Sequence, residues 1–195
     1  MIRIQSAEYA GTVYDKLPEL AEVAFAGRSN AGKSSLINAL LNRHGLVRVS
    51  KQPGKTRNIN FFRIDAKDEP SFYFVDLPGY GYAQVCHDMK DAWEKLAGRY
   101  FGGNQRLKLL FVLIDIRRDL REDEYLTLKL VEHSGGRAQL VATKADRLNQ
   151  SERAKRLKEL EKQAGHRPLA VSSTEKTGLN QIWDAILTAV RPESD

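Results

Sequence analysis

The chain has 195 residues, 42% of them hydrophobic, a single cysteine and a formal net charge of +6 at neutral pH. This length suffices for one domain with its own hydrophobic core, while a lone cysteine excludes an intrachain disulfide and a four-cysteine metal site. The positive charge favours a polyanionic partner. The chain start does not have the pattern of a signal peptide, and the most hydrophobic run, residues 107–116, is too short to span a bilayer. We therefore expect a cytoplasmic protein with no membrane contact.

In chain order, short apolar runs that indicate strands alternate with stretches of helical periodicity. The strands are expected to end near Ala26, Ala66, Val75, Ile114, Ala142 and Val171. Helices are expected around residues 34–42, 89–101, 122–133, 151–164 and 178–190. This alternation predicts an α/β, three-layer fold with helices on both faces of a mostly parallel sheet. One strand, residues 59–66, is expected to run antiparallel and to pair with residues 72–75 through a turn at 67–70.

The first motif lies between the first such strand and the helix that follows it, and it reads Gly27-Arg28-Ser29-Asn30-Ala31-Gly32-Lys33-Ser34. Glycines at both ends allow a loop to wrap closely around phosphate oxygens, with its backbone N–H groups pointing inward. Lys33 can reach the β- and γ-phosphates, and the Ser34 hydroxyl can hold Mg²⁺. The motif predicts a nucleotide-binding P-loop, and Ser35 continues it into the helix.

A second motif, Asp76-Leu77-Pro78-Gly79, ends the apolar strand at residues 72–75. A carboxylate at the end of such a strand, facing a P-loop, holds Mg²⁺, usually through a water molecule. Gly79 lets its backbone N–H approach the γ-phosphate. Taken alone this motif is often an ordinary turn, but its place downstream of a P-loop favours the nucleotide role.

The third motif, Thr143-Lys144-Ala145-Asp146, follows another strand and selects the base. Guanine presents two adjacent donors, N1–H and the exocyclic amine, and the Asp146 carboxylate can accept both, whereas adenine offers no such pair. Lys144 can lay its aliphatic stem along the purine face. After the last strand, the loop Ser172-Ser173-Thr174 is expected to offer backbone N–H groups to the guanine carbonyl.

Between the first two motifs lies a polar loop in which Thr56 is the best candidate for a γ-phosphate sensor, because its hydroxyl can complete a Mg²⁺ shell only when that phosphate is present. We expect Lys33, Thr56, Gly79 and Asn30 to act in catalysis, and Ser34, Thr56 and Asp76 to hold the metal. The nucleotide contacts expected from this loop are Gly54, Lys55, Thr56, Arg57 and Asn58.

These motifs, in this order, resemble the EngB family of bacterial ribosome-assembly GTPases (also called YihA or YsxC), which belongs to the translation-factor-like P-loop GTPases. The resemblance runs from about Ala21 to Arg191 and is most specific at residues 27–35, 53–56, 76–83 and 143–146. It implies a P-loop GTPase fold, GTP binding with Mg²⁺, slow hydrolysis, a role in maturing the large ribosomal subunit, and a link to cell division and septation. On this basis residues 1–20 are an amino-terminal extension, residues 21–191 the GTP-binding domain and residues 192–195 a short tail.

The chain departs from common GTPase patterns at two positions. Thr143 replaces the usual asparagine, so we expect a weaker hydrogen bond between the base loop and the P-loop. Tyr80 stands where Ras-like proteins carry a glutamine that orients the attacking water, which predicts slow unaided hydrolysis.

Asn30 leaves two interpretations open. In some relatives an asparagine at this position accompanies K⁺ bound beside the phosphates, and such a cation would stabilise developing charge. Alternatively, Asn30 simply fits the geometry of the loop's turn.

The expected partners are GTP or GDP and the large ribosomal subunit or its precursor, bound by a monomer. A cluster of basic side chains around the Thr56 loop could bind RNA phosphate, or it could simply be solvated: Arg43, Arg48, Lys51, Lys55 and Arg57. Three other functions stay open: a GTPase with a non-ribosomal target, a kinase or ATPase, and a GTP-gated binding protein with negligible turnover. The guanine motif argues against the kinase and the ATPase.

Overall fold

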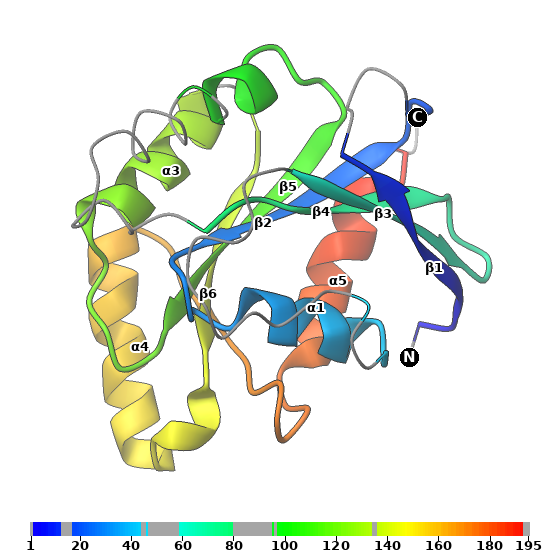
Figure 1. Ribbon diagram of the computed structural model, residues 1–195. Helices are drawn as coiled ribbons and strands as arrows, with labels where there is room; N and C mark the ends of the chain where they lie inside the picture. The colour runs from blue at the N-terminus through cyan, green and yellow to red at the C-terminus, as the bar shows by residue number, and fades with distance from the viewer. Residues whose placement is uncertain are drawn as a thin grey trace.

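The computed structural model describes residues 2–12, 17–43, 46, 59–79, 95, 97–133 and 136–192. Seven strands form one sheet in the order β1-β3-β4-β2-β5-β6-β7, with helices on both faces (Figure 1). The strands are β1 Ile4–Gly11, β2 Ala21–Gly27, β3 Asn60–Ala66, β4 Phe72–Asp76, β5 Leu107–Asp115, β6 Ala138–Thr143 and β7 Leu169–Ala170. The helices are α1 Lys33–Leu40, α3 Glu122–His133, α4 Gln150–Ala164 and α5 Leu179–Val190, with a short 3₁₀ helix, η2, at Ala145–Arg147.

Strand β3 runs antiparallel to both of its neighbours, β1 and β4, and the remaining neighbours pair in parallel. The expected hairpin is present, with Asn60 opposite Asp76 and Ile64 opposite Phe72. The predicted fold class, a mostly parallel sheet with one antiparallel strand, is therefore confirmed. Within the described residues, no helix is both long enough and apolar enough to cross a membrane.

The alternation of side chains along β2 explains the two cores. Val23 and Phe25 point to the face covered by α1 and α5, where Phe25 packs against Phe74 and Phe74 in turn stacks on Trp183 of α5. Ala24 and Ala26 point to the opposite face, which α3 and α4 cover. Because both faces are covered, the central strands are apolar at almost every position, as a buried parallel sheet requires.

Strand β1 was not foreseen, because residues 2–20 carry no clear pattern. The structure pairs β1 with β3, from Ile4 opposite Ala66 to Gly11 opposite Phe61. Ala7 is its one buried residue, and Tyr9 is 56% exposed. This edge strand lacks the apolar alternation that identifies strands in a sequence, and Ile4 is its one β-branched side chain. The division of the chain at residue 20 stays a prediction.

The observed helices agree with the expected ones to within a few residues. Helix α3 has the expected bounds, and α4 begins at a capping box in which the Asn149 side chain accepts from the Glu152 backbone N–H and the Glu152 carboxylate accepts from that of Asn149. Such a box satisfies N–H groups that have no partner inside the helix. Of the helix expected at 89–101, residues 97–101 are helical, and most of the preceding part lies outside the described residues.

Candidate functional site

The candidate site lies where parallel strands end side by side. The register places Phe25 of β2 opposite Asp76 of β4, and Asp115 of β5 opposite Thr143 of β6. The three sequence motifs that the structure describes lie at residues 27–34, 76–79 and 143–146. They therefore meet at one edge of the sheet, as the rule for ligand sites in α/β folds anticipates.

The segment from Gly27 to Lys33 forms a tight loop between β2 and α1. A side chain at Gly27 would place its first carbon 2.8 Å from the Leu113 carbonyl oxygen, so only glycine fits without a shift of the backbone. Asn30 and Gly32 have φ angles of +67° and +91°, in the left-handed region that asparagine and glycine tolerate best. The turn-geometry interpretation of Asn30 therefore has a structural basis.

The phosphate side of the site is built on an ion pair between Lys33 and Asp76. The Lys33 ammonium contacts the Asp76 carboxylate, and the two side chains are only 10% and 4% exposed. Gly79 lies against the loop, since a carbon added at its Cα would sit 3.3 Å from the Ser29 backbone nitrogen. The second motif is thus packed on the first, with the two charges that the sequence assigns to phosphate and metal in direct contact.

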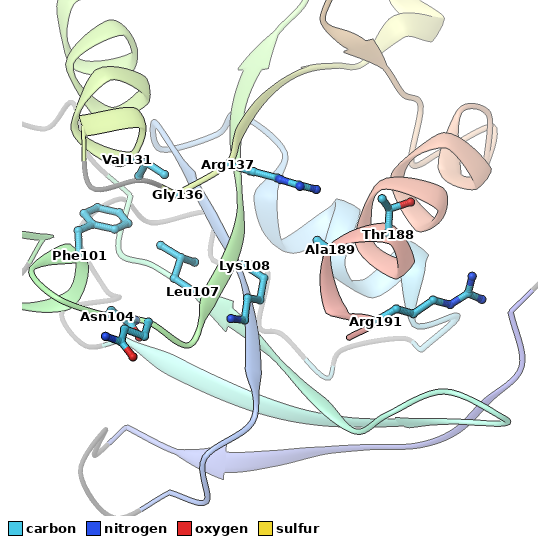
Figure 2. Close-up of a pocket in the computed structure, with 11 residues that line it drawn as sticks. Phe101, Asn104, Leu107, Lys108, Val131, Gly136, Arg137, Thr188, Ala189 and Arg191 are labelled. Carbon is cyan, nitrogen blue, oxygen red and sulfur yellow. The ribbon is translucent and has the colours of Figure 1, made fainter. Parts of the chain in front are cut away.

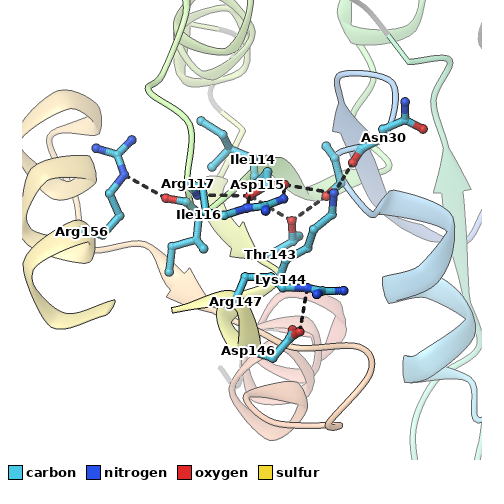
Figure 3. A network of polar contacts seen from close by, with 11 residues as sticks. Asn30, Ile114, Asp115, Ile116, Arg117, Thr143, Lys144, Asp146, Arg147 and Arg156 are labelled. Atoms are coloured by element: carbon cyan, nitrogen blue, oxygen red, sulfur yellow. Dashed lines mark hydrogen bonds and ion pairs between the residues drawn. The ribbon is translucent and has the colours of Figure 1, made fainter. Parts of the chain in front are cut away.

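Lys144 connects the base motif to two other elements. Its backbone has a φ of +57°, and its ammonium lies 2.8 Å from the Asn30 carbonyl oxygen, to which it donates, and 3.0 Å from Asp115 Oδ2 (Figure 3). The side chain therefore extends from the end of β6 across to the P-loop. Its aliphatic stem has a fixed course at the position where a purine ring could rest on it.

Asp115, at the end of β5, holds this lysine in place. Arg117 donates to it twice through the guanidinium, at 2.9 and 2.7 Å, and once through the backbone N–H at 3.1 Å. Burial raises the pKa of the Asp115 carboxyl, but the hydrogen bonds from Arg117 and Lys144 outweigh burial and hold that pKa well below its ordinary value. Asp115 is therefore anionic at neutral pH, and Lys144 is fixed against it.

Asp146 is oriented by two side chains. The Ser172 hydroxyl donates to its Oδ1 at 2.6 Å, and Arg147 Nε lies 3.3 Å from Oδ2. The Ser172 oxygen in turn accepts the Glu175 backbone N–H at 3.1 Å, which directs the hydroxyl hydrogen toward the carboxylate. Ser172 is fully buried. This contact fixes the plane of the Asp146 carboxylate before any ligand arrives.

Thr143 ties the base motif to the P-loop. Its hydroxyl lies 2.6 Å from the Ala31 carbonyl oxygen and 3.0 Å from that of Ile114, and it is buried. The hydroxyl can donate to one of these carbonyls at a time, and the shorter contact is the one to the P-loop. Thr143 thus makes the link that the sequence led us to expect in a weaker form.

These elements enclose a cavity of about 160 Å³ beside the start of α1. It is lined by Gly32, Ser35, Thr143, Lys144, Asp146, Arg147, Ser173 and Thr174. The structure therefore brings together the P-loop, the third motif and the loop after the last strand, which the sequence assigned to one ligand.

Other predicted residues lie outside the described part of the chain. They are Gly54, Lys55, Thr56, Arg57, Asn58 and Tyr80. Their roles stay predictions.

The structure also adds residues that sequence reasoning missed. Asp115 and Arg117 fix Lys144, and Asp123 of α3 pairs with Arg28 of the P-loop at 3.0 Å. An aspartate directly after the long apolar run of β5 was a signal available in the sequence, since it marks a strand end at the same edge as the motifs. The contact between Arg28 and Asp123, 95 positions apart, carries no such signal.

Comparison with known proteins identifies the family. Residues 22–144 match the model of a family described as "50S ribosome-binding GTPase". A protein of Clostridioides difficile (strain 630), named "Probable GTP-binding protein EngB", is 39% identical over 95% of this chain and 94% of its own length. A protein of the same name from Lachnospira eligens is 42% identical over 94% of this chain and 88% of its own length. The chain belongs to the EngB family of GTP-binding proteins.

A solved structure agrees with this assignment at the level of the fold. The crystal structure of a probable GTP-binding protein EngB has a TM-score of 0.68 and 19% identity, and it covers 88% of this chain and 99% of that one. Asp146 and residues 172–174 lie beyond the segment matched by the family model, but the EngB relatives extend over nearly the whole chain.

Proposed function

We propose that this EngB-family protein is a cytoplasmic GTP-gated factor in the assembly of the large ribosomal subunit, and that it hydrolyses GTP slowly. The observation that carries the nucleotide part is the Asp146 carboxylate, held by Ser172 and Arg147 beside a cavity that the P-loop also lines. A carboxylate fixed in this way accepts the N1–H and the amine of guanine together. Adenine would leave it unpaired, at a cost of about 1–3 kcal/mol.

The phosphates are expected to bind along the P-loop, with Lys33 leaving Asp76 for the β- and γ-phosphate oxygens. The Ser34 hydroxyl and the Asp76 carboxylate fit Mg²⁺, which takes oxygen ligands and is usually held by one or two protein groups together with substrate phosphates. Bound Mg²⁺ would neutralise charge that develops on the phosphate oxygens. Asp76 is only 3% exposed, so salt and water would screen its charge less than that of a surface carboxylate once Lys33 moves.

Slow hydrolysis is proposed from Tyr80, since a phenol cannot present the paired donor and acceptor of a glutamine amide. We expect unaided turnover at or below about 10⁻⁴ s⁻¹, the order of Ras alone. Replacing Tyr80 by alanine should then change turnover by less than about threefold, whereas a loss above about a hundredfold would assign catalysis to Tyr80 itself.

Equal turnover in K⁺ and Na⁺ at matched ionic strength would remove the potassium role of Asn30.

The ribosomal part of the proposal has different support. The family model that matches is described as ribosome-binding, and the net charge of +6 suits an RNA partner. We also propose a role in cell division and septation, which the resemblance to the EngB family implies. We propose that a monomer binds the large subunit or its precursor while it holds GTP and leaves after hydrolysis.

Co-sedimentation with purified large ribosomal subunits tests this proposal. The protein is centrifuged with subunits in a non-hydrolysable GTP analogue, in GDP, or without nucleotide, across a salt series. Binding that requires the analogue and weakens steeply with salt is the expected result. Binding that ignores the nucleotide, or that is absent even at low salt, would leave the GTP site in place and remove the ribosome from the proposal.

A further inference from the structure

A second, larger cavity lies at the other end of the sheet from the nucleotide motifs. It has a volume of about 380 Å³ and crosses the amino ends of β5 and β6, between the end of α3 and the end of α5 (Figure 2). Figure 2 shows Phe101, Asn104 and Leu107 on one side of this groove, and Arg137, Thr188 and Arg191 on the other, with Lys108 between them. We call it the amino-end groove.

Two cations of this groove have no acidic partner in the part of the chain that the structure describes: Lys108 at the start of β5 and Arg137 just before β6. Both are exposed, and their strands are neighbours, since the Arg137 carbonyl oxygen accepts the Leu110 N–H at 2.8 Å. Other basic residues nearby are paired. Arg106 lies 3.2 Å from the buried Glu22, and Arg191 lies 2.6 Å from Glu69.

The pattern distinguishes a binding surface from ordinary solvated charge. Lys155 and Lys158 lie exposed on helix α4, whereas Lys108 and Arg137 line a recess together with polar side chains of Gln105 and Thr188. A recess that combines uncompensated positive charge with hydrogen-bonding groups and an apolar wall suits a flexible strand carrying phosphates and bases. A flat lipid surface would not enter such a recess.

We propose that the amino-end groove binds the phosphate backbone of single-stranded RNA, with Lys108 and Arg137 each contacting a phosphate. The identification of that RNA as ribosomal rests on the proposed function. The strands place this groove and the guanine site at opposite ends of the same sheet. We therefore expect RNA binding in the groove to be independent of the bound nucleotide, and to be only one part of a contact with the large subunit that requires GTP as a whole.

The test is a double substitution, Lys108→Gln with Arg137→Gln, assayed with a fluorescent oligouridine of about 12 nucleotides, a length within the usual site size of single-strand binders. The matched control is Lys155→Gln with Lys158→Gln, which removes the same charge from the exposed face of α4. Two lost phosphate contacts should lower the slope of log binding constant against log salt by about 1.4. If the variant and the original protein bind equally at 1 M salt, this slope change makes the variant bind about 25-fold more weakly than the original protein at about 0.1 M salt. The affinity for GDP should be unchanged in both variants.

Equal weakening by the control variant, or oligouridine binding that the groove variant leaves unchanged, would overturn the groove proposal. The groove proposal would also be overturned if the Lys108→Gln, Arg137→Gln variant lost binding to anionic lipid vesicles but kept its RNA binding. The groove would then be a membrane-binding surface. Failure of the unaltered protein to co-sediment with large subunits would instead refute the proposed function. In that case the oligouridine result still decides whether the groove binds RNA.

Discussion

The two halves of the candidate nucleotide site differ in how their charged groups are engaged. On the base side, Asp146 is held by Ser172, and Lys144 is held between Asp115 and the Asn30 carbonyl oxygen. These contacts are made by the protein itself, and they fix the groups that we propose for guanine recognition before any ligand binds. On the phosphate side, Lys33 and Asp76 contact each other, and in the proposed function each exchanges that contact for a ligand.

This difference separates recognition from chemistry. A base site that is already ordered requires little reorganisation, so its selectivity is a property of the folded protein. On the proposed function, the phosphate side acts only once Lys33 has turned to the phosphates and Asp76 to the metal. We therefore expect base-side substitutions to change which nucleotide binds, and phosphate-side substitutions to change whether any nucleotide binds.

The largest effect is expected from Lys33→Ala. It removes a charged donor to two phosphates, each worth about 1.5–3 kcal/mol, so the affinity for GDP and GTP should fall at least about 100-fold with base preference unchanged. Titration with a fluorescent guanine nucleotide measures this. Circular dichroism should check that the variant is folded, because the substitution leaves the buried Asp76 without its ion-pair partner.

Lys158→Ala on α4 is the matched control and should leave nucleotide affinity unaltered. A loss of less than about threefold in Lys33→Ala would contradict the assignment of the phosphate side, since it is smaller than one ordinary hydrogen bond.

The next largest effect is expected from Asp146→Asn. The amide cannot accept both guanine donors, so GTP affinity should fall by about 2–4 kcal/mol, or roughly 30- to 1000-fold. Xanthine carries a carbonyl where guanine carries the amine, so the amide's N–H can donate to it, and xanthosine nucleotides should bind more tightly to the variant than to the original protein. Competition between GTP and XTP for the variant and for the original protein measures this change in base preference. A variant that loses both nucleotides equally would show that Asp146 supports the fold and does not read the base.

A smaller loss of nucleotide affinity is expected from Ser172→Ala on the base side. It removes the hydrogen bond that orients Asp146 but keeps the carboxylate, so GTP affinity should fall by about 0.5–1.5 kcal/mol, or roughly 2- to 13-fold. Preference for guanine over xanthine should be retained. Reversal of that preference would mean that Ser172 itself contacts the base.

Asp115→Asn tests whether the Asp115 carboxylate holds Lys144, and the readout is how the free energy of unfolding depends on pH. The folded pKa of Asp115 is depressed, so the stability that it contributes is fully present above the unfolded value of about 3.9 and is lost as pH falls through the folded value. The difference in free energy of unfolding between the original protein and the variant should therefore be constant from about pH 8 to 5 and shrink only below about pH 4. Urea unfolding at several pH values measures it, and a difference that changes between pH 8 and 6 would contradict this role.

The sequence predicted the sheet and its edge because parallel strands must be buried and end together. It singled out Lys33, Asp76 and Asp146 because phosphate, metal and guanine each demand a particular chemical group, and their roles stay predictions. It could not predict that Lys33 and Asp76 contact each other, or that Ser172 orients Asp146, since these contacts depend on packing between distant segments. Strand β1 was missed because it has a weak pattern, and its pairing with β3 supplies what its composition does not.

One measurement tests most directly whether the base site controls partner binding: co-sedimentation of the Asp146→Asn protein with large ribosomal subunits in non-hydrolysable GTP or XTP analogues. We expect the original protein to sediment with the GTP analogue, and the variant to sediment with the XTP analogue and not with the GTP analogue. Variant binding that is the same in both analogues and without nucleotide would contradict nucleotide gating through this site.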